Sequence, residues 1–128
     1  MTESSAKTVA LIAHDNKKET MIAFVDAHRA VLAKYYLIAT ETTGALIQKR
    51  CHLPVKRVLS GPIGGDAQIA AQVAEGKVAA VFFFIDPLGA HPHDPDINSL
   101  LRICNVHDVP LATNPATAAF IISPERAL

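Results

Sequence analysis

Short apolar runs alternate along the chain with longer segments in which apolar residues recur every three or four positions. The apolar runs have the length of strands, and we predict strands at residues 8–13, 36–39, 55–59, 79–85 and 111–113. The longer segments predict helices at residues 17–33, 42–51, 66–75, 95–106 and 115–122. Such alternation is typical of a parallel sheet with helices on both faces. We therefore expect one Rossmann-like α/β domain over residues 1–128, built on a five-stranded, mainly parallel sheet.

Small polar and ionisable residues follow every predicted strand. The strand exits read His14-Asp15, Thr40-Glu41-Thr42-Thr43, Ser60-Gly61, Asp86-Pro87 and Thr113-Asn114. In open parallel sheets, ligands bind beyond the carboxyl ends of the strands. We therefore expect a small-molecule site at this edge of the sheet.

One group of these residues suits a phosphate. The segment from Thr40 to Gly44 joins a strand to a helix N-terminus, which offers free backbone N–H groups and a positive dipole. Ser60-Gly61 has a similar character, and Lys18, one turn into the first predicted helix, adds a full positive charge. The alternative for Thr42 and Thr43 is that one of them only caps the helix.

A second group suits acid–base chemistry. Gly64-Gly65 allows backbone conformations that aim Asp66 into a cleft, although Asp66 also fits a helix N-cap. In the segment His91-Pro92-His93-Asp94-Pro95-Asp96, the Asp-Pro pair is a good helix start, and Asp96 suits the first-turn dipole. His93 has no comparable structural explanation, so it is the stronger candidate for chemistry.

The same segment also allows a metal-dependent hydrolase. With Asp86 just before it, the segment brings together two histidines and three carboxylates, and His14 and Asp15 would be additional ligands. Their spacing matches no zinc signature, so we expect no metal. The five clustered residues are His91, His93, Asp86, Asp94 and Asp96.

Composition narrows the class of protein. The formal net charge is zero, so no basic excess indicates nucleic-acid binding. The longest apolar run, residues 78–85, is too short to cross a bilayer, and residues 1–7 lack the features of a signal peptide. Cys51 and Cys104 fall in predicted helices, where we expect them to be buried as small hydrophobic groups. We expect a cytoplasmic protein.

Five segments together resemble the methylglyoxal synthases, in order along almost the whole chain. The SGPxGGDxQ and PHDPD motifs are specific to that family. The segments are ALIAHDNKK (residues 10–18), ATETTG (39–44), LSGPIGGDAQ (59–68), FFFIDPLGAHPHDPD (82–96) and LATNPATA (111–118). The resemblance implies a compact Rossmann-like enzyme, usually a homohexamer, that turns dihydroxyacetone phosphate into methylglyoxal and inorganic phosphate without a cofactor.

The resemblance also implies roles for single residues. Asp66 matches the catalytic aspartate, and His93 matches a histidine that binds substrate oxygens and moves protons. Asp86 and Asp96 match active-site carboxylates, and His14 matches another active-site histidine. The positions that match phosphate-holding residues are Lys18, Thr40, Thr42, Thr43, Ser60 and Gly61.

Two features depart from the family pattern. Glu41 stands where the family usually has glycine, and its carboxylate would repel a phosphate. We expect Glu41 to contribute only its backbone N–H and to turn its side chain away. The tail is also shorter than in some members, so we carry over neither the tail residues that approach a neighbouring subunit's site nor allosteric regulation by phosphate.

These residues suit the implied reaction. Asp66 would remove the proton next to the substrate carbonyl, helped by burial and neighbouring carboxylates that raise the pKa of an aspartate. His93 and His14 would donate hydrogen bonds to the enediolate, which then expels the gripped phosphate. The main alternative is a regulatory domain of the same fold that binds a phosphate ligand without reaction. Such a sensor has no need of Asp66, His93 and Asp96 together.

Overall fold

Five strands form one sheet in the order β3-β2-β1-β4-β5, and all four strand pairings are parallel. The computed structural model describes residues 7–89 and 94–123, with the side chains of residues 94–96 outside that description. The strands are β1 (Thr8–Ala13), β2 (Tyr36–Thr40), β3 (Lys56–Val58), β4 (Ala80–Phe84) and β5 (Leu111–Ala112). The predicted α/β fold with a five-stranded parallel sheet is therefore confirmed.

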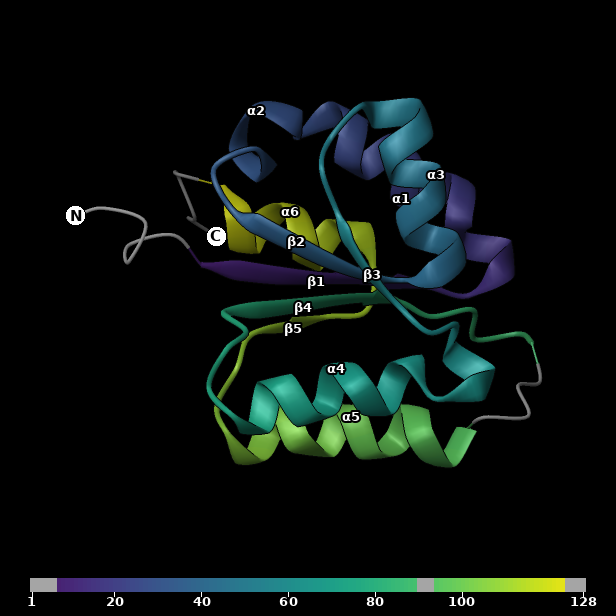
Figure 1. Ribbon diagram of the computed structural model, residues 1–128, viewed down its shortest axis with the longest axis vertical. Helices are drawn as coiled ribbons and strands as arrows, with labels where there is room; N and C mark the ends of the chain where they lie inside the picture. Colours follow the sequence, from purple (N-terminus) through teal and green to yellow (C-terminus); the bar gives the residue numbers. More distant parts are fainter. Residues whose placement is uncertain (1–6, 90–93, 124–128) are drawn as a thin grey trace.

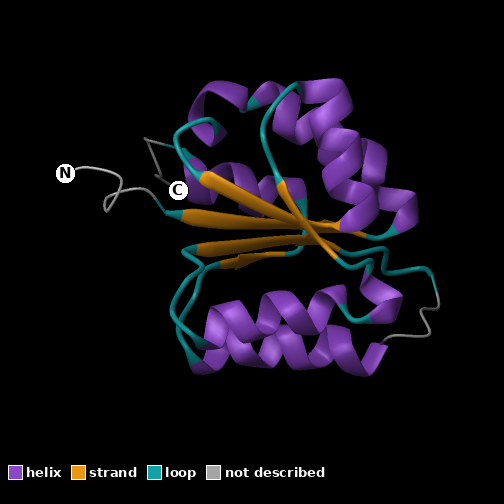
Figure 2. Ribbon diagram, in the orientation of Figure 1, coloured by secondary structure: helices purple, strands orange, loops and turns teal. Residues whose placement is uncertain are grey.

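Helices cover both faces of the sheet (Figure 1, Figure 2). On one face lie α1 (Lys18–Ala27), α2 (Arg29–Leu32), α3 (Glu41–Cys51) and α6 (Pro115–Ile122); on the other lie α4 (Gly65–Ala74) and α5 (Asp94–Val106). Two short 3₁₀ turns, η2 (Asp15–Lys17) and η3 (Gly61–Ile63), follow β1 and β3. Because all strands are parallel, every strand ends at the same edge of the sheet, and the segments that follow the strands lie together there.

Alternate residues along a strand pack into two separate hydrophobic cores, one on each face of the sheet. Phe82 and Phe84 of β4 pack into the core under α1, α3 and α6, whereas Phe83 packs into the core over α4 and α5. All three phenylalanines are at most 1% exposed, and each such burial contributes about 1.5–3 kcal/mol. The sheet therefore anchors both helical layers.

Most predicted elements match the observed bounds within one residue, and two differences have a clear structural cause. The helix predicted at residues 17–33 is interrupted between α1 and α2, because the backbone bends at His28 (φ −116°, ψ 25°). There the carbonyl of Phe24 is 2.9 Å from His28 Nδ1 and also accepts from the His28 N–H. The strand predicted at residues 55–59 ends at Val58, because the Leu59 N–H donates to Gln68 Oε1 (2.8 Å) instead of a strand neighbour.

Both cysteines are buried, as predicted, one in each core. Desolvation is the main cause that raises the pKa of the Cys51 thiol, and it alone raises the pKa of the Cys104 thiol. Both thiols therefore stay protonated and behave as small apolar groups. Among the described residues, no helix combines the length and the apolar character that a membrane span requires.

Candidate active site

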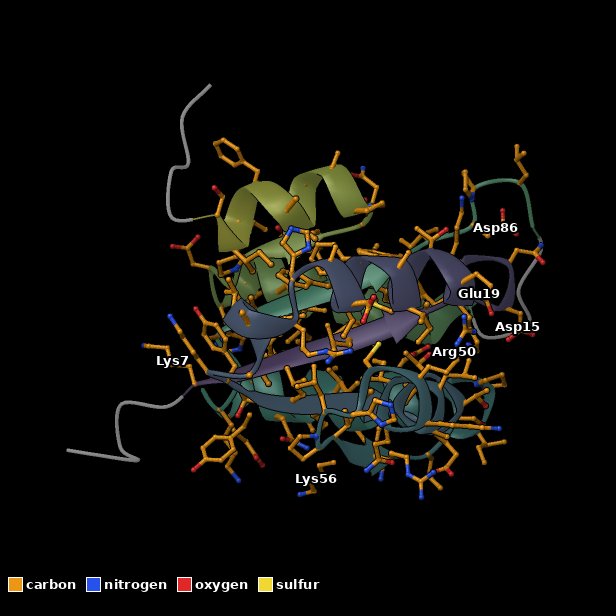
Figure 3. All side chains as sticks on the ribbon, turned by 90° about the horizontal axis from the view of Figure 1, so that it is seen from above. Lys7, Asp15, Glu19, Arg50, Lys56 and Asp86 are labelled. Atoms are coloured by element: carbon orange, nitrogen blue, oxygen red, sulfur yellow. The ribbon has the colours of Figure 1, made fainter. Side chains whose placement is uncertain are left out.

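A cavity of about 460 Å³ opens at the carboxyl edge of the sheet, where β1, β2 and β4 end. Figure 3 shows Asp15 and Asp86 at this end of the molecule, whereas Lys7, just before β1, lies at the opposite end. The predicted site residues that line the cavity are His14, Asp15, Lys18, Thr40, Thr42, Gly61, Asp66 and Asp86. The cavity therefore brings together predicted residues from the segments that follow four of the strands, β1 to β4.

His14 is fixed in position and in tautomer. Its backbone N–H donates to the carbonyl of Phe84 (3.1 Å), which extends the pairing of β1 with β4 by one residue. The residue is 6% exposed, and its ring lies edge-on to Phe83 and accepts the backbone N–H of Asp86 at Nδ1 (2.9 Å). An acceptor nitrogen carries no proton, so the neutral ring has its hydrogen on Nε2. His14 is thus a hydrogen-bond donor at Nε2.

Asp86 is a buried carboxylate with donors on both oxygens. Oδ2 accepts from Asn16 Nδ2 (3.0 Å), and Oδ1 accepts from the Leu88 N–H (3.0 Å). Asp86 therefore holds the loop after β4 and orients Asn16, while its backbone orients His14. Asn16 also lines the cavity; it was not among the predicted residues, although it lies between Asp15 and Lys18 after β1.

Lys18 brings the positive charge. Its Nζ donates to the carbonyl of Ala13 (2.7 Å) and to Thr43 Oγ1 (3.4 Å), and it lies 3.4 Å from the exposed carboxylate of Asp15. These contacts hold the ammonium group between the end of β1 and the first turn of α3. The predicted cation therefore lies beside the predicted phosphate loop.

The predicted phosphate loop is the start of α3. Thr40 occupies the N-cap position with extended backbone (φ −66°, ψ 160°), and the helix begins at Glu41. The alternative that Thr42 or Thr43 caps this helix is wrong, because both lie inside its first turn. Thr42 faces the cavity, whereas Thr43 is 1% exposed and reaches the site only through Lys18.

Asp66 lies in the first turn of α4 and is completely buried at the wall of the cavity. The alternative that Asp66 is an N-cap is also wrong, because Gly64 occupies that position with φ 116°. Gly65 packs against the end of β3: a Cβ on it would lie 1.9 Å from the carbonyl oxygen of Leu59. The two glycines therefore allow the sharp, close turn that places Asp66 in the cavity wall.

Some predicted site residues are not in the cavity wall. Gly61 lines it, but Ser60 does not; its carbonyl accepts from the N–H groups of Ile63 (3.2 Å) and Gly65 (2.9 Å). Glu41 lies outside the wall, with its carboxylate 3.3 Å from Arg57 Nη1. His93 lies outside the described residues. Asp96 is placed only by its backbone, in the first turn of α5.

The described residues contain no group of three or more His, Cys, Asp or Glu side chains arranged to hold a metal. The cluster considered from the sequence depends on His91 and His93, which lie outside the described residues, as do the side chains of Asp94 and Asp96. The members of this cluster that the structure describes in full are His14, Asp15 and Asp86, and the contacts of Asp86 include Asn16, the Leu88 N–H and His14.

Fold and site together define a class of protein. A parallel α/β sheet carries, at its carboxyl edge, a polar cavity with a buried carboxylate, a neutral histidine and a lysine beside a helix N-terminus, which is typical of enzymes for small anionic substrates. Residues 20–113 match the family described as MGS-like domain. The chain belongs to the methylglyoxal synthase family, and it is an enzyme of the lyase class.

Relatives cover nearly the whole chain. A methylglyoxal synthase of Thermus thermophilus is 61% identical over 91% of this chain and 93% of its own length. One of Clostridium beijerinckii is 56% identical over 89% of this chain and 96% of its own length. The crystal structure of methylglyoxal synthase from Elizabethkingia anophelis superimposes with a TM-score of 0.88 at 46% identity, covering 94% of this chain and 79% of that one. The predicted family is therefore confirmed.

Proposed function

We propose that this enzyme converts dihydroxyacetone phosphate into methylglyoxal and inorganic phosphate through an enediolate, with Asp66 as the general base. The observation that carries the proposal is the place of Asp66. Its carboxylate is completely buried, yet it lines the same cavity as His14 and the start of α3. A base, a hydrogen-bond donor and an anion-binding helix end thus share one cavity, which this reaction requires.

The phosphate group would bind at the start of α3. The N–H groups and the dipole at the N-terminus of α3 favour an anion, and the hydroxyls of Thr40 and Thr42 add donors. Lys18 supplies the charge, and Gly61 lets the backbone of η3 approach closely. Of the other residues that the resemblance assigns to phosphate, Thr43 would act by positioning Lys18, and Ser60 by fixing the turn around Gly61.

Asp66 would then take a proton from the hydroxymethyl carbon of the substrate. A carboxylate removed from water is a stronger base than one in solution. Abstraction of that proton gives the enediolate, whose developing negative charge needs a donor. His14 suits this role because its remaining ring hydrogen is on Nε2. By resemblance, His93 is the second donor and proton carrier, and Asp96 supports it.

Elimination completes the reaction. The terminal hydroxyl loses its proton and its oxygen forms the aldehyde C=O bond, the C=C bond of the enediolate shifts to the phosphate-bearing carbon, and the C–O bond to phosphate breaks as inorganic phosphate leaves. The resulting enol takes up a proton at its methylene carbon and becomes methylglyoxal. The grip on the phosphate would hold the breaking C–O bond perpendicular to the enediolate plane, which favours elimination over isomerisation. Only protons and phosphate move, so the steps need no cofactor.

We also propose that the chain works as a homohexamer in the cytoplasm. Several large apolar side chains are exposed in the single chain, including Leu88 (95%) and Ile63 (67%) near the cavity. Such groups are typical of surfaces that become buried by association. Light scattering at micromolar concentration should give six times the chain mass; a monomer would contradict this proposal.

The function is tested by following both products from dihydroxyacetone phosphate in the presence of EDTA. We expect the wild type to release methylglyoxal and phosphate in equal amounts. Asp66→Asn removes the base without changing its size, so kcat should fall by about 10²–10⁴-fold. Circular dichroism should show that this variant is folded. A folded wild type that binds phosphate but forms no product would instead support the regulatory domain.

A further inference from the structure

A negative charge lies next to the proposed phosphate site. Glu41 is the first residue of α3, between two cavity-lining threonines, Thr40 and Thr42. The N-terminus of a helix attracts carboxylates as well as phosphates. A free Glu41 side chain would therefore compete for the N–H groups that the substrate needs, and its charge would repel the substrate.

Arg57 is placed to prevent this. It lies on the edge strand β3, in register with Ala39 of β2, the residue before Thr40. Its Nη1 lies 3.3 Å from Glu41 Oε2. The carboxylate is thus drawn toward the outer edge of the sheet, and Glu41 does not line the cavity.

Gly44 provides the path for the arginine side chain. A Cβ on Gly44 would lie 2.5 Å from Cγ and 3.1 Å from Cδ of Arg57. The aliphatic part of Arg57 therefore crosses the first turn of α3 at the one point where that helix has no side chain. This close contact sets the direction in which the guanidinium group reaches Glu41.

We propose that Arg57 is a positioning residue that holds the Glu41 carboxylate out of the cavity and thereby sets the affinity of the site for a phosphate group. The inference rests on the proposed function, since it takes the ligand to be a phosphate ester. The two side chains are 41% and 52% exposed, so their ion pair contributes little to folding stability. The ion pair instead determines where the negative charge of the Glu41 carboxylate lies relative to the cavity.

The test is Arg57→Gln, studied by the Kd for inorganic phosphate in calorimetry and by kcat and KM with dihydroxyacetone phosphate. Release of Glu41 should raise both Kd and KM by about three- to tenfold, because one unit charge moves to within a few ångströms of the anion. The increase should shrink as salt screens the charge, and kcat should stay near that of the wild type. Arg57→Lys should restore most of the affinity.

Arg50→Gln is the matched control. Arg50 lies on the last turn of the same helix and pairs with Glu19 (2.7 Å) at a similar exposure, side by side in Figure 3. Its loss changes the net charge equally, but from the last turn of α3 and outside the cavity wall, so Kd should rise clearly less than for Arg57→Gln. An equal rise in Kd for both variants would show only a general charge effect and would overturn the proposal.

The decisive comparison uses chains that already carry Glu41→Gln. Without the carboxylate, Arg57→Gln should change the Kd by less than about 1.5-fold, because the two residues act as a coupled pair. A full loss of affinity in that background would mean that Arg57 itself binds the anion, and would overturn the proposal. So would an unchanged Kd for Arg57→Gln alone. Wild type that binds phosphate without turnover would refute the proposed reaction, but the Kd comparison would still decide the role of Arg57.

Discussion

The smallest unit of the site is the set of hydrogen bonds among His14, Asn16 and Asp86. The backbone N–H of Asp86 occupies Nδ1 of His14, and the Asp86 side chain holds Asn16 and the Leu88 N–H. One aspartate therefore fixes a ring, an amide and a loop. These contacts suit Asp86 to a supporting role, while Asp66 remains the proposed base.

Replacing Asp86 by alanine should therefore cost stability. Asn16 and the Leu88 N–H lose their acceptor, and we expect a loss of about 1–3 kcal/mol in the free energy of unfolding. Urea denaturation measures it. The control is Asp26→Ala, which removes an exposed carboxylate paired with Arg29 and should change stability by less than about 0.5 kcal/mol. Equal effects would mean that the buried contacts of Asp86 add nothing.

At this scale the sequence predicted which residues gather, but not what each one does. His14, Thr40 and Asp86 follow from polar residues at strand exits. The side-chain direction after a strand depends on local turns such as η3, which turns Ser60 away from the cavity wall. Such turns leave no periodic signal. Asn16 was missed for the same reason.

At the scale of elements, the junction between β3 and α4 decides where Asp66 lies. The backbone of Leu59 and Ser60 lies against Gly65, and the Gly65 N–H donates to the Ser60 carbonyl (2.9 Å). Gln68, one turn later, bonds back to Leu59 (2.8 Å). The helix is thus joined tightly to the end of the strand.

Gly65→Ala should disrupt this junction. The new methyl group would overlap the Leu59 carbonyl, so the start of α4 must move, at a cost of about 2–4 kcal/mol in unfolding free energy. Gly76→Ala is the control, because nothing lies within 4 Å of its Cβ and only its φ of 77° is unfavourable. That strain costs about 1–2 kcal/mol. Thermal or urea unfolding of both variants checks the order; a larger loss at Gly76 would contradict it.

The elements themselves were largely predictable. Runs such as residues 79–85 are apolar and bulky because their strands are buried on both faces, and each predicted strand and helix has an observed counterpart. The break at His28 was not predictable, because it depends on a contact with the Phe24 carbonyl inside an otherwise regular helical stripe. The end of β3 depends on Gln68, nine residues away.

At the scale of the whole molecule, two helical layers share one sheet. Cys51 lies in the core under α1, α3 and α6, and Cys104 lies in the core over α4 and α5. Each thiol therefore reports on one layer. If the chain is a single domain, both layers should open together.

This is tested with Cys51→Ala and Cys104→Ala, each leaving one thiol. We expect no fast reaction with a thiol reagent at pH 8 in the folded state, because burial raises the pKa of both thiols from about 9.0. Slow labelling should report opening free energies that agree within about 1 kcal/mol. A tenfold or greater difference in the opening equilibrium would mean that the layers are separate folding units.

The same shifts predict a pH dependence. Because the folded pKa of each thiol is raised, the thiols contribute stability that is complete below pH 9.0. Above it the unfolded chain loses thiol protons first, so this contribution falls as the pH rises toward the folded pKa values. Unfolding free energies from pH 7 to 10 should fall less steeply for a double Cys→Ala variant than for the wild type. Equal slopes would contradict the assigned cause.

The parallel sheet separates the molecule into two ends with different tolerance for new sequence. The cavity uses the connections at the carboxyl edge, whereas β1 begins and α6 ends at the opposite edge (Figure 1). The exposed turns at Lys34, Gly76-Lys77 and His107-Asp108 also lie there, since they lead into strands. A reporter domain inserted in one of these turns, or a circular permutation that opens the chain there, would leave the catalytic edge continuous. This end is therefore the place to attach the enzyme to a surface or to a partner enzyme.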